Sequence, residues 1–384
     1  MLAPLTKGIE VEVFTGTRQG DVVGMSPKVV PALGNPFVFE SDARHLEYVT
    51  DPFTSYDDLA RQIVEPRMAL REFLDQQGGL TVLPFSTIAL PFNQEFEPSL
   101  PNNTYYQWVG ANFGTKILTS SVHISVGLDD MDDIVNVTNW LRMDMPLFLA
   151  LTAASPYRNG EYTGYHSSRW IDFPQEPVDM RFFDGHADFV KFVEDGLASG
   201  KMRSLRHMWS AVRPNGQDRP YDLNRIEARI CDLVMDPALL LAVTAVLEAR
   251  IIQLQMRSGK PADHLLKISR ENERRVAKDS LNATVWHYGK DVSVRVAIAR
   301  MIGEVEGIMR ALGTYHHLEV IDEVLAKGNE AMRFIKRVEE LGDLRTAMME
   351  AIDEAEAIDY RWTRILAERA AAQTGTAQDA HRLV

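Results

Sequence analysis

Cysteine is almost absent from this chain, since Cys231 is the single one among 384 residues. One cysteine excludes an intramolecular disulfide and a zinc site built from cysteines, and it is typical of a reducing compartment. We therefore expect a cytoplasmic location. A lone cysteine is most often a small, unreactive apolar residue, so we expect no redox chemistry from Cys231.

Basic residues and long apolar runs are also scarce. The chain has 41 Lys and Arg against 54 Asp and Glu, a formal net charge of −13, whereas nucleic acids and anionic membranes are usually held by clustered cations. Apolar runs such as 237–247 fall short of the ~18 residues of a membrane span, and the start of the chain does not resemble a signal peptide. We expect partners that are small molecules or cations, not nucleic acid or membrane.

The common nucleotide-binding and hydrolase motifs are missing as well. The sequence contains no Walker A motif, no G-x-G-x-x-G, no H-E-x-x-H and no G-x-S-x-G. Residues 196–202 look like a phosphate loop, but they have one residue too few between the glycines and Met202 where Ser or Thr is needed. A nucleotide, if one binds, must bind on another scaffold.

The order of secondary structure along the chain indicates the fold class. The first 230 residues are rich in β-branched and aromatic residues with Gly and Pro between them, which predicts strands and loops, interrupted by helices over 55–77, 131–154 and 187–200. Asp236-Pro237 is a helix-start signal. From there we expect a helix up to Gly259 and later helices over 263–287, 291–312, 316–327, 329–341 and 343–371.

Strands followed by helices favour an α+β fold with an antiparallel sheet over a doubly wound fold. We expect a sheet-rich catalytic part at residues 1–235 and a helical part at 236–371 packed on the same domain. The Gln- and Thr-containing tail at 372–384 is expected to be disordered.

Four of the expected strands carry charged residues on one face. In 8–13 the period of two puts Glu10 and Glu12 on the same side, about 6.6 Å apart. Taken alone, this pattern is better explained as an edge strand with solvated glutamates. The pattern recurs, however, in three further segments, 46–49 with Glu47, 119–126 with His123, and 225–230 with Glu227 and Arg229. Together they predict one sheet whose concave side is a charged, solvated site.

Such a site would require cations. Carboxylates ~4 Å apart repel by ~1 kcal/mol per pair in water and by ~4 kcal/mol at an effective dielectric of 20. Oxygen ligands with one imidazole suit Mg²⁺ or Mn²⁺ better than zinc or iron, although His123 taken alone could be a hydrogen-bonded core histidine. The arginines on the same faces indicate an anionic substrate, because a guanidinium binds carboxylate or phosphate through two hydrogen bonds.

Five segments in this order resemble the glutamate–cysteine ligases, and most of all the cyanobacterial type, which is related to the plant enzymes and to the carboxylate–amine ligase group. They are Gly8-Ile-Glu-Val-Glu12, Leu46-Glu-Tyr-Val-Thr50, Val122-His-Ile-Ser-Val-Gly127, 149–169 with its Leu-Ala-Leu-Thr-Ala-Ala-Ser-Pro block, and Ile226-Glu-Ala-Arg-Ile-Cys-Asp232. The resemblance spans about residues 7–300. It implies a fold similar to glutamine synthetase, in which a curved antiparallel sheet forms a funnel.

The resemblance also implies roles for individual residues. The positions that match the family's metal ligands are Glu10, Glu12, Glu47, His123 and Glu227, with Glu40 at a further acidic position for which Asp42 is the alternative. Arg169 and Arg229 match arginines that hold glutamate or the transferring phosphate. Asn272 and Lys278 lie in a stretch that resembles a nucleotide-binding segment, although Lys278 stands where arginine is usual. A solvated charged helix face explains this last stretch nearly as well.

The activity implied is ATP-dependent ligation. The γ-carboxylate of L-glutamate would attack ATP to give γ-glutamyl phosphate, which the amine of L-cysteine would capture in the first step of glutathione biosynthesis. The expected cofactors are ATP, as a substrate, and Mg²⁺ or Mn²⁺, and a homodimer is left open. Three alternatives are weighed at this point: a carboxylate–amine ligase with a different amine acceptor, a metal-dependent amidohydrolase, which would need no ATP, and a non-enzymatic binding protein. The last is disfavoured because a buried charged face costs stability unless it is occupied.

Overall fold

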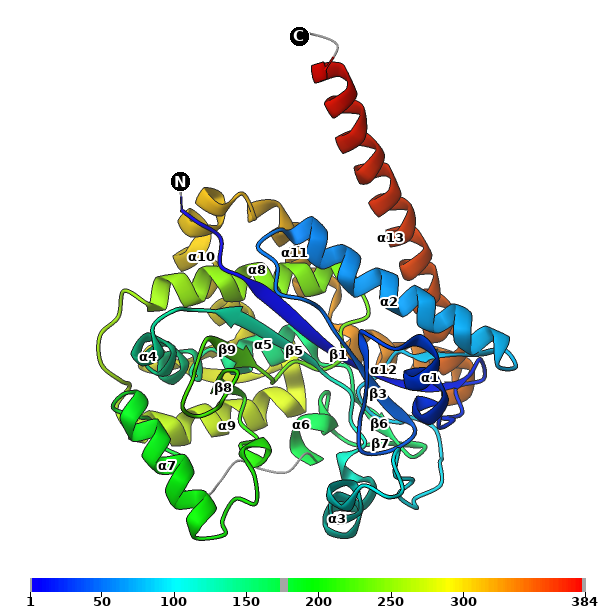
Figure 1. Cartoon of the computed structure of the whole chain (residues 1–384), viewed down its shortest axis with the longest axis horizontal. Helices are drawn as coiled ribbons and strands as arrows, with labels where there is room; N and C mark the ends of the chain where they lie inside the picture. Colours follow the sequence, from blue (N-terminus) through cyan, green and yellow to red (C-terminus); the bar gives the residue numbers. More distant parts are fainter. Residues whose placement is uncertain (1, 173–178, 382–384) are drawn as a thin grey trace.

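One antiparallel sheet organises the front half of the chain in the computed structural model, which describes residues 2–172 and 179–381 (Figure 1). Its strands run in the order β2-β3-β1-β5-β9-β8, and β4 also pairs with β1. Their bounds are β1 (Lys7–Thr17), β2 (Phe37–Phe39), β3 (His45–Val49), β4 (Leu80–Leu83), β5 (Val122–Gly127), β8 (Val212–Asn215) and β9 (Arg225–Ala228). The predicted α+β class with an antiparallel sheet is confirmed.

The register of this sheet brings the charged residues together. Glu12 lies opposite Glu47 on the β1–β3 ladder, and Glu10 lies opposite His123 on the β1–β5 ladder. Glu227 on β9 lies opposite Ser125 and Arg213 on its two neighbours. The four strands expected to share a charged face therefore are neighbours in one sheet.

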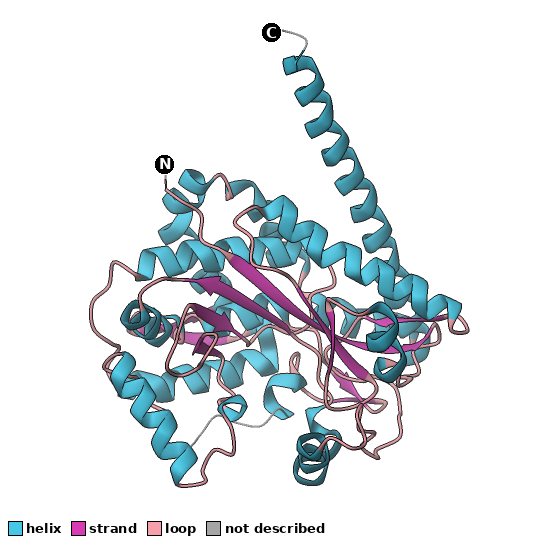
Figure 2. Cartoon of the chain, viewed as in Figure 1, coloured by secondary structure: helices cyan, strands magenta, loops and turns pink. Residues whose placement is uncertain are grey.

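Helices of the front half surround the sheet (Figure 2). They are α1 (Ser26–Leu33), α2 (Tyr56–Gln76), α3 (Thr104–Phe113), α4 (Met131–Leu141), α5 (Met145–Thr152), α6 (Ser168–Asp172) and α7 (His186–Ala198), with a small β6–β7 ribbon (Tyr157–Arg158, Glu161–Tyr162). The helices expected over 55–77 and 187–200 are confirmed. The single helix expected over 131–154 is wrong: Pro146 has no N–H to continue it, and the chain breaks after Leu141 and restarts at Met145.

The back half is helical, as expected, with one exception. Its helices are α8 (Pro237–Leu254), α9 (His264–Asp279), α10 (Val294–Leu312), α11 (Leu318–Lys327), α12 (Glu330–Leu341) and α13 (Leu344–His381). The helices expected over 263–287 and 291–312 extend too far towards each other, because β10 (Thr284–His287) and β11 (Lys290–Ser293) form a hairpin between them. Tyr288 and Gly289 both have positive φ, 48° and 86°, which is typical of a tight hairpin turn.

Helix α8 is the central core helix. Asp236 caps it by accepting a hydrogen bond from the Ala238 N–H, and Pro237 occupies its first turn. By length and composition the 18 residues of α8 could cross a membrane, although the sequence contains no uninterrupted apolar run of that length. In the folded protein 83% of this stretch is buried, as expected for a core helix. Its apolar side chains pack against both halves of the chain.

The two halves share a large hydrophobic cluster, which extends from Ile9 on β1 to Leu366 on α13, and a smaller one that joins Phe14 and Phe85 to Phe334 and Ile352. Helix α13 lies against α2 and then extends away from the body (Figure 1). Its backbone is helical up to His381, past residue 371 where the sequence predicts a disordered tail. The alanines at 370–372 are strong helix formers, so the helix has a local reason to continue. Residues 382–384 of the expected tail lie outside the described part of the chain.

Candidate functional site

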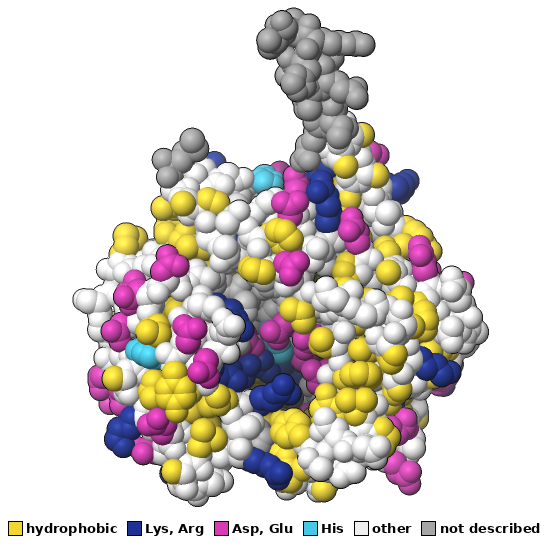
Figure 3. Space-filling view, viewed as in Figure 1, with side chains coloured by type: hydrophobic (Ala, Val, Ile, Leu, Met, Phe, Trp, Pro, Cys, Tyr) yellow, Lys and Arg dark blue, Asp and Glu magenta, His cyan; other side chains and the backbone are white. Residues whose placement is uncertain are grey.

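A hollow lined by charged side chains opens over the sheet (Figure 3). The space-filling view shows acidic, basic and histidine side chains gathered at its centre. The cavity has a volume of about 430 Å³, within the range of small-molecule sites. Six of the predicted site residues line it, namely Glu10, Glu12, Glu40, Glu47, His123 and Arg229.

Glu10, His123 and Glu227 form the first group of potential metal ligands, which we call the His123 cluster. One ligand atom from each lies within 4.8 Å of the others. Nδ1 of His123 is 2.8 Å from Oε2 of Glu10 and 4.0 Å from Oε1 of Glu227. Nε2 of the same ring is 3.0 Å from the hydroxyl of Ser121, so both ring nitrogens have partners.

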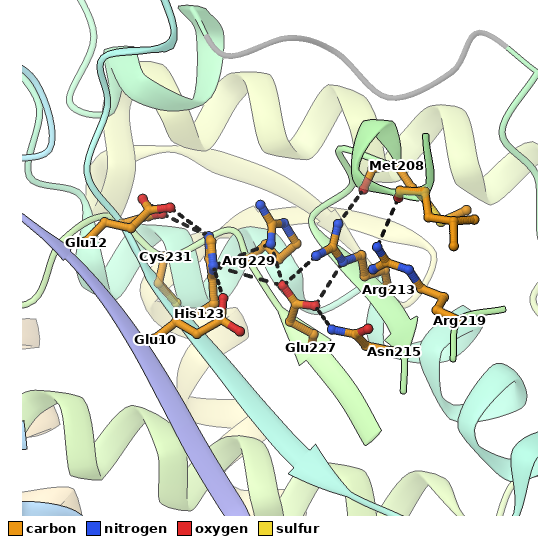
Figure 4. Close-up of polar contacts among 12 residues, drawn as sticks. Glu10, Glu12, His123, Met208, Arg213, Asn215, Arg219, Glu227, Arg229 and Cys231 are labelled. Atoms are coloured by element: carbon orange, nitrogen blue, oxygen red, sulfur yellow. Dashed lines mark hydrogen bonds and ion pairs between the residues drawn. The ribbon is translucent and has the colours of Figure 1, made fainter. Parts of the chain in front are cut away.

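Glu227 is fully buried and is held by cations (Figure 4). Arg213 donates to both of its oxygens, at 2.9 and 3.0 Å, and Arg229 and Asn215 donate as well. Burial alone would raise the pKa of Glu227, but the charges of Arg213 and Arg229 outweigh it and hold that pKa well below its usual range. The ionised form of Glu227 is therefore favoured, with arginines on one side and Glu10 and His123 on the other.

Glu12, Glu40 and Glu47 form the second group, the Glu47 cluster, with ligand atoms again within 4.8 Å. Burial and the nearby charges of Glu10 and Glu40 raise the pKa of Glu47 well above its usual value, and burial also raises the pKa of Glu40. The pKa of Glu12 is lowered instead, because His123, His45 and the Ser121 hydroxyl outweigh its burial. The raised pKa values mean that the ionised forms of Glu40 and Glu47 are disfavoured by burial and by the charges of neighbouring carboxylates, which a nearby positive charge would offset.

The donor atoms of both clusters fit Mg²⁺ or Mn²⁺. Carboxylate oxygens with an imidazole are ligands that hard divalent cations accept, and repulsion among closely spaced carboxylates falls when a cation lies between them. Of the two candidates for the further acidic position, Glu40 lines the cavity. Asp42 is instead buried against Arg44, which donates to it at 2.8 and 2.7 Å.

The two predicted arginines have different surroundings. Arg229 lines the cavity, and its Nη1 donates to Glu227 and lies 3.4 Å from Nδ1 of His123. Arg169 is buried against the segment that follows β9, where its Nη2 donates to the carbonyls of Arg229 and Cys231 at 2.8 and 2.6 Å and its Nε lies 3.1 Å from Asp232. The geometry supports an anion-binding position for Arg229 and a bracing position for Arg169.

The structure does not bring Asn272 and Lys278 to the cavity. The amide of Asn272 donates to the carbonyl of Trp286 and accepts from its N–H, both at 2.9 Å, so it attaches the β10–β11 hairpin to α9. Lys278 is exposed. Nearby Glu271 forms surface ion pairs with Arg274 and Arg275. The solvated charged face is the better explanation of this stretch.

Several cavity residues escaped sequence reasoning. They are His45, Tyr105, Tyr106, Arg206, Trp209 and Arg213, together with Asn215 and Arg219 beside Glu227. His45 is two residues before Glu47, so the two side chains lie on the same face of a strand. A predicted strand that began at residue 45 instead of 46 would have identified it. Strand β8 contains Pro214, and a proline argues against predicting a strand. For this reason Arg213, on the same strand, was not predicted.

Cys231 is fully buried, and burial raises the pKa of its thiol to about 12. Because the thiolate is the reactive form, we expect a thiol-specific reagent such as iodoacetamide to leave the native protein unlabelled at pH 8. The denatured chain should take up one label, measured by mass spectrometry. Rapid labelling of the native protein would contradict the buried position.

Comparisons with known proteins agree with this geometry. Residues 6–356 match the family model described as glutamate–cysteine ligase family 2. A relative from Rubrobacter xylanophilus is 26% identical over 349 residues, which are 86% of this chain and 91% of the relative. One from Paenarthrobacter aurescens is 25% identical over 382 residues, 91% and 95% of the two chains. Both carry the provisional name glutamate–cysteine ligase.

Solved structures share the fold. A glutamate–cysteine ligase from Francisella tularensis, solved in complex with AMP, superposes with a TM-score of 0.76 at 14% identity and covers 97% of this chain and 94% of its own. A bifunctional glutathione synthetase from Pasteurella multocida also gives 0.76, at 15% identity; the match covers 93% of this chain but about half, 53%, of that enzyme. With the family matched from β1 into α13, and the carboxylates, imidazole and arginine gathered on one sheet face, this chain belongs to glutamate–cysteine ligase family 2.

Proposed function

We propose that this chain is an ATP-dependent ligase that joins the γ-carboxylate of L-glutamate to the amine of L-cysteine through γ-glutamyl phosphate, as in the first step of glutathione biosynthesis. The observation that carries the proposal is the division of charge within one cavity. The Glu47 cluster gathers three carboxylates, whereas Arg213, Arg219 and Arg229 surround Glu227 a short distance away. The carboxylates of the Glu47 cluster suit divalent cations. The three arginines suit anionic groups, such as the phosphates that bind together with divalent cations.

Phosphoryl transfer depends mainly on positioning and on neutralising charge. Glu10, Glu227 and His123 would hold one divalent cation, and the Glu47 cluster would hold another. When bound, Mg²⁺ would neutralise phosphate oxygens and make the phosphorus easier to attack.

Arg229 would hold the transferring phosphate or the glutamate carboxylate with its guanidinium fork. Arg219 offers further donors nearby, since its Nε and Nη1 have no hydrogen-bond partner among the described residues. Arg213 and Asn215 fix the carboxylate of Glu227 in place. This mechanism requires no side-chain nucleophile, which agrees with the inert setting of Cys231.

A ligase with a different amine acceptor is the second candidate, and an adjoining groove favours it. Tyr105, Tyr106 and Arg206 line both the cavity and a groove that continues to Asn103 and Arg203. The guanidinium of Arg206 lies 5.8 Å from the Tyr105 ring centre. A groove with aromatic rings and two guanidiniums suits an acceptor that is larger than cysteine and carries a negative group.

The test is ADP release by the purified chain given ATP, Mg²⁺ and glutamate, with candidate amines added one at a time. We expect ADP only when glutamate and an accepted amine are both present, and the product should be a γ-glutamyl amide by mass spectrometry. The Glu10→Gln variant is the control for contaminating ATPases. Cleavage of an amide without ATP would contradict the ligase and support the amidohydrolase. The cytoplasmic location and the homodimer stay predictions.

A further inference from the structure

His45 is the first residue of β3 and lies at the cavity wall with one ring nitrogen unused. The residue is 4% exposed, and its Nε2 has no hydrogen-bond partner among the described residues. By contrast, both ring nitrogens of His123 have partners. Buried polar atoms are almost always paired, and at the wall of a cavity lined by carboxylates an unpaired nitrogen can take its partner from the cavity.

His45 lies on the same strand as Glu47, two residues before it. His45 lies opposite Phe14, and Glu47 lies opposite Glu12, so the imidazole shares a sheet face with Glu12 and Glu47. The Phe14 ring, with its centre 5.1 Å from that of His45, packs against the imidazole and limits its rotation. His45 also lines the same cavity as Glu40.

The distance between His45 and Glu12 fits shared ligation better than direct contact. Nε2 lies 3.9 Å from Oε2 of Glu12, which is too long for a hydrogen bond. Two ligands of one divalent cation, each bonded at about 2.0–2.2 Å, lie at most ~4.4 Å apart. The two atoms are therefore already at a separation that one ion can bridge.

We propose that Nε2 of His45 is a fourth protein ligand of a divalent cation held by Glu12, Glu40 and Glu47, and that this nitrogen makes the site prefer Mn²⁺ to Mg²⁺. Mg²⁺ retains oxygen ligands and water, whereas first-row transition ions accept imidazole readily. The inference rests on the cation binding in the proposed function and not on the identity of the amine.

The probe is Mn²⁺ alone, added to the full chain produced without a histidine tag. The paramagnetic resonance signal of free Mn²⁺ measures affinity, and pulsed resonance detects ¹⁴N bonded to the bound ion. His45→Gln should weaken Mn²⁺ binding at one of two sites about tenfold or more and remove nitrogen coupling there. Mg²⁺ affinity, measured by competition, should change less than threefold, because the glutamine side chain can offer an oxygen.

His287→Gln is the matched control. His287 is also buried, at 7% exposure, and both of its ring nitrogens lack partners among the described residues, but it lies on β10 and outside the residues that line the cavity. This variant should bind Mn²⁺ like the parent chain. Equal losses in both variants would mean that removing any buried imidazole loosens the protein, and would overturn the inference.

Unchanged Mn²⁺ affinity and unchanged nitrogen coupling in a folded His45→Gln variant would also overturn it. If that variant does not fold, His123→Gln decides, because His45 should then still give nitrogen coupling to a Mn²⁺ ion, and loss of all coupling would exclude it as a ligand. These measurements need no turnover. A chain that binds Mn²⁺ through His45 but releases no ADP would contradict the proposed function alone.

Discussion

Lysine at position 229 is expected to lower kcat/KM by about 100- to 1,000-fold, which is ~3–4 kcal/mol of transition-state stabilisation. Arg229 lines the cavity, and its side chain is 14% exposed. Lysine keeps the charge that faces Glu227 but loses the planar fork that can hold two oxygens of one anion. The melting temperature should change by only a few degrees. Steady-state kinetics with ATP, glutamate and amine varied in turn measure the loss.

Arg169→Lys is the matched comparison, because it makes the same chemical change 60 positions earlier at an arginine that braces the backbone. Lysine cannot donate to the carbonyls of Arg229 and Cys231 and also pair with Asp232 as the guanidinium does. We expect a lower melting temperature with a smaller loss of kcat. Equal losses of kcat/KM with unchanged melting in both variants would instead assign the two arginines to one bound anion, as the sequence suggested.

Glu227→Gln is expected to lower the free energy of unfolding by about 3–5 kcal/mol, in addition to abolishing activity. The carboxylate is fully buried and accepts hydrogen bonds from Arg213, Arg229 and Asn215. A neutral amide keeps the shape but leaves the guanidiniums of Arg213 and Arg229 without their buried counter-charge, and breaking a buried pair in this way costs about that amount. Urea unfolding followed by circular dichroism measures the change.

Glu10→Gln is the control, since this carboxylate is 27% exposed at the cavity and contacts His123. It should lose most activity and keep its stability within about 1 kcal/mol, as expected for a side chain open to solvent. Acid adds a second readout. The pKa of Glu227 is lower in the folded chain than in the unfolded chain, where it is near 4.5. Its stabilisation of the fold is therefore fully present above the unfolded pKa, and it is lost as the pH falls through the folded pKa. Stability that depends on pH to the same extent in the parent and in Glu227→Gln would contradict the buried pair.

Most of the predicted residues that line the cavity lie on regular strands or directly after one. Glu10, Glu12, Glu47 and His123 alternate with apolar neighbours on their strands, and Arg229 continues the alternation of β9 by one residue, so the period of two shows which face they occupy. That face became a cavity because the apolar side of the same strands had to be buried against helices such as α2 and α8. The prediction of a charged sheet face therefore depended only on local pattern.

Residues outside regular strands were harder to place. The similarity of Arg169 and Asn272 to family motifs predicted contact with ligands, but their side chains bond to backbone groups of the segment that follows β9 and of β10. Which way such a side chain points depends on packing against segments about 60 or 14 positions away, and no local pattern records it. Arg213 was not predicted for a related reason. Pro214 argues against a strand at this position, but pairing with the neighbouring β9 nevertheless stabilises β8.

The sequence by itself determined the α+β class, the charged strand faces, the inert cysteine and the family. Alternation and helical period are local properties, and they follow from how each segment separates apolar from polar side chains. Only the tertiary structure decided which charges meet: that Glu12 faces Glu47, that Arg213 neutralises Glu227, and that His45 lies beside Glu12. Those encounters are set by strand order and register, which depend on the packing of the whole core and on no single segment.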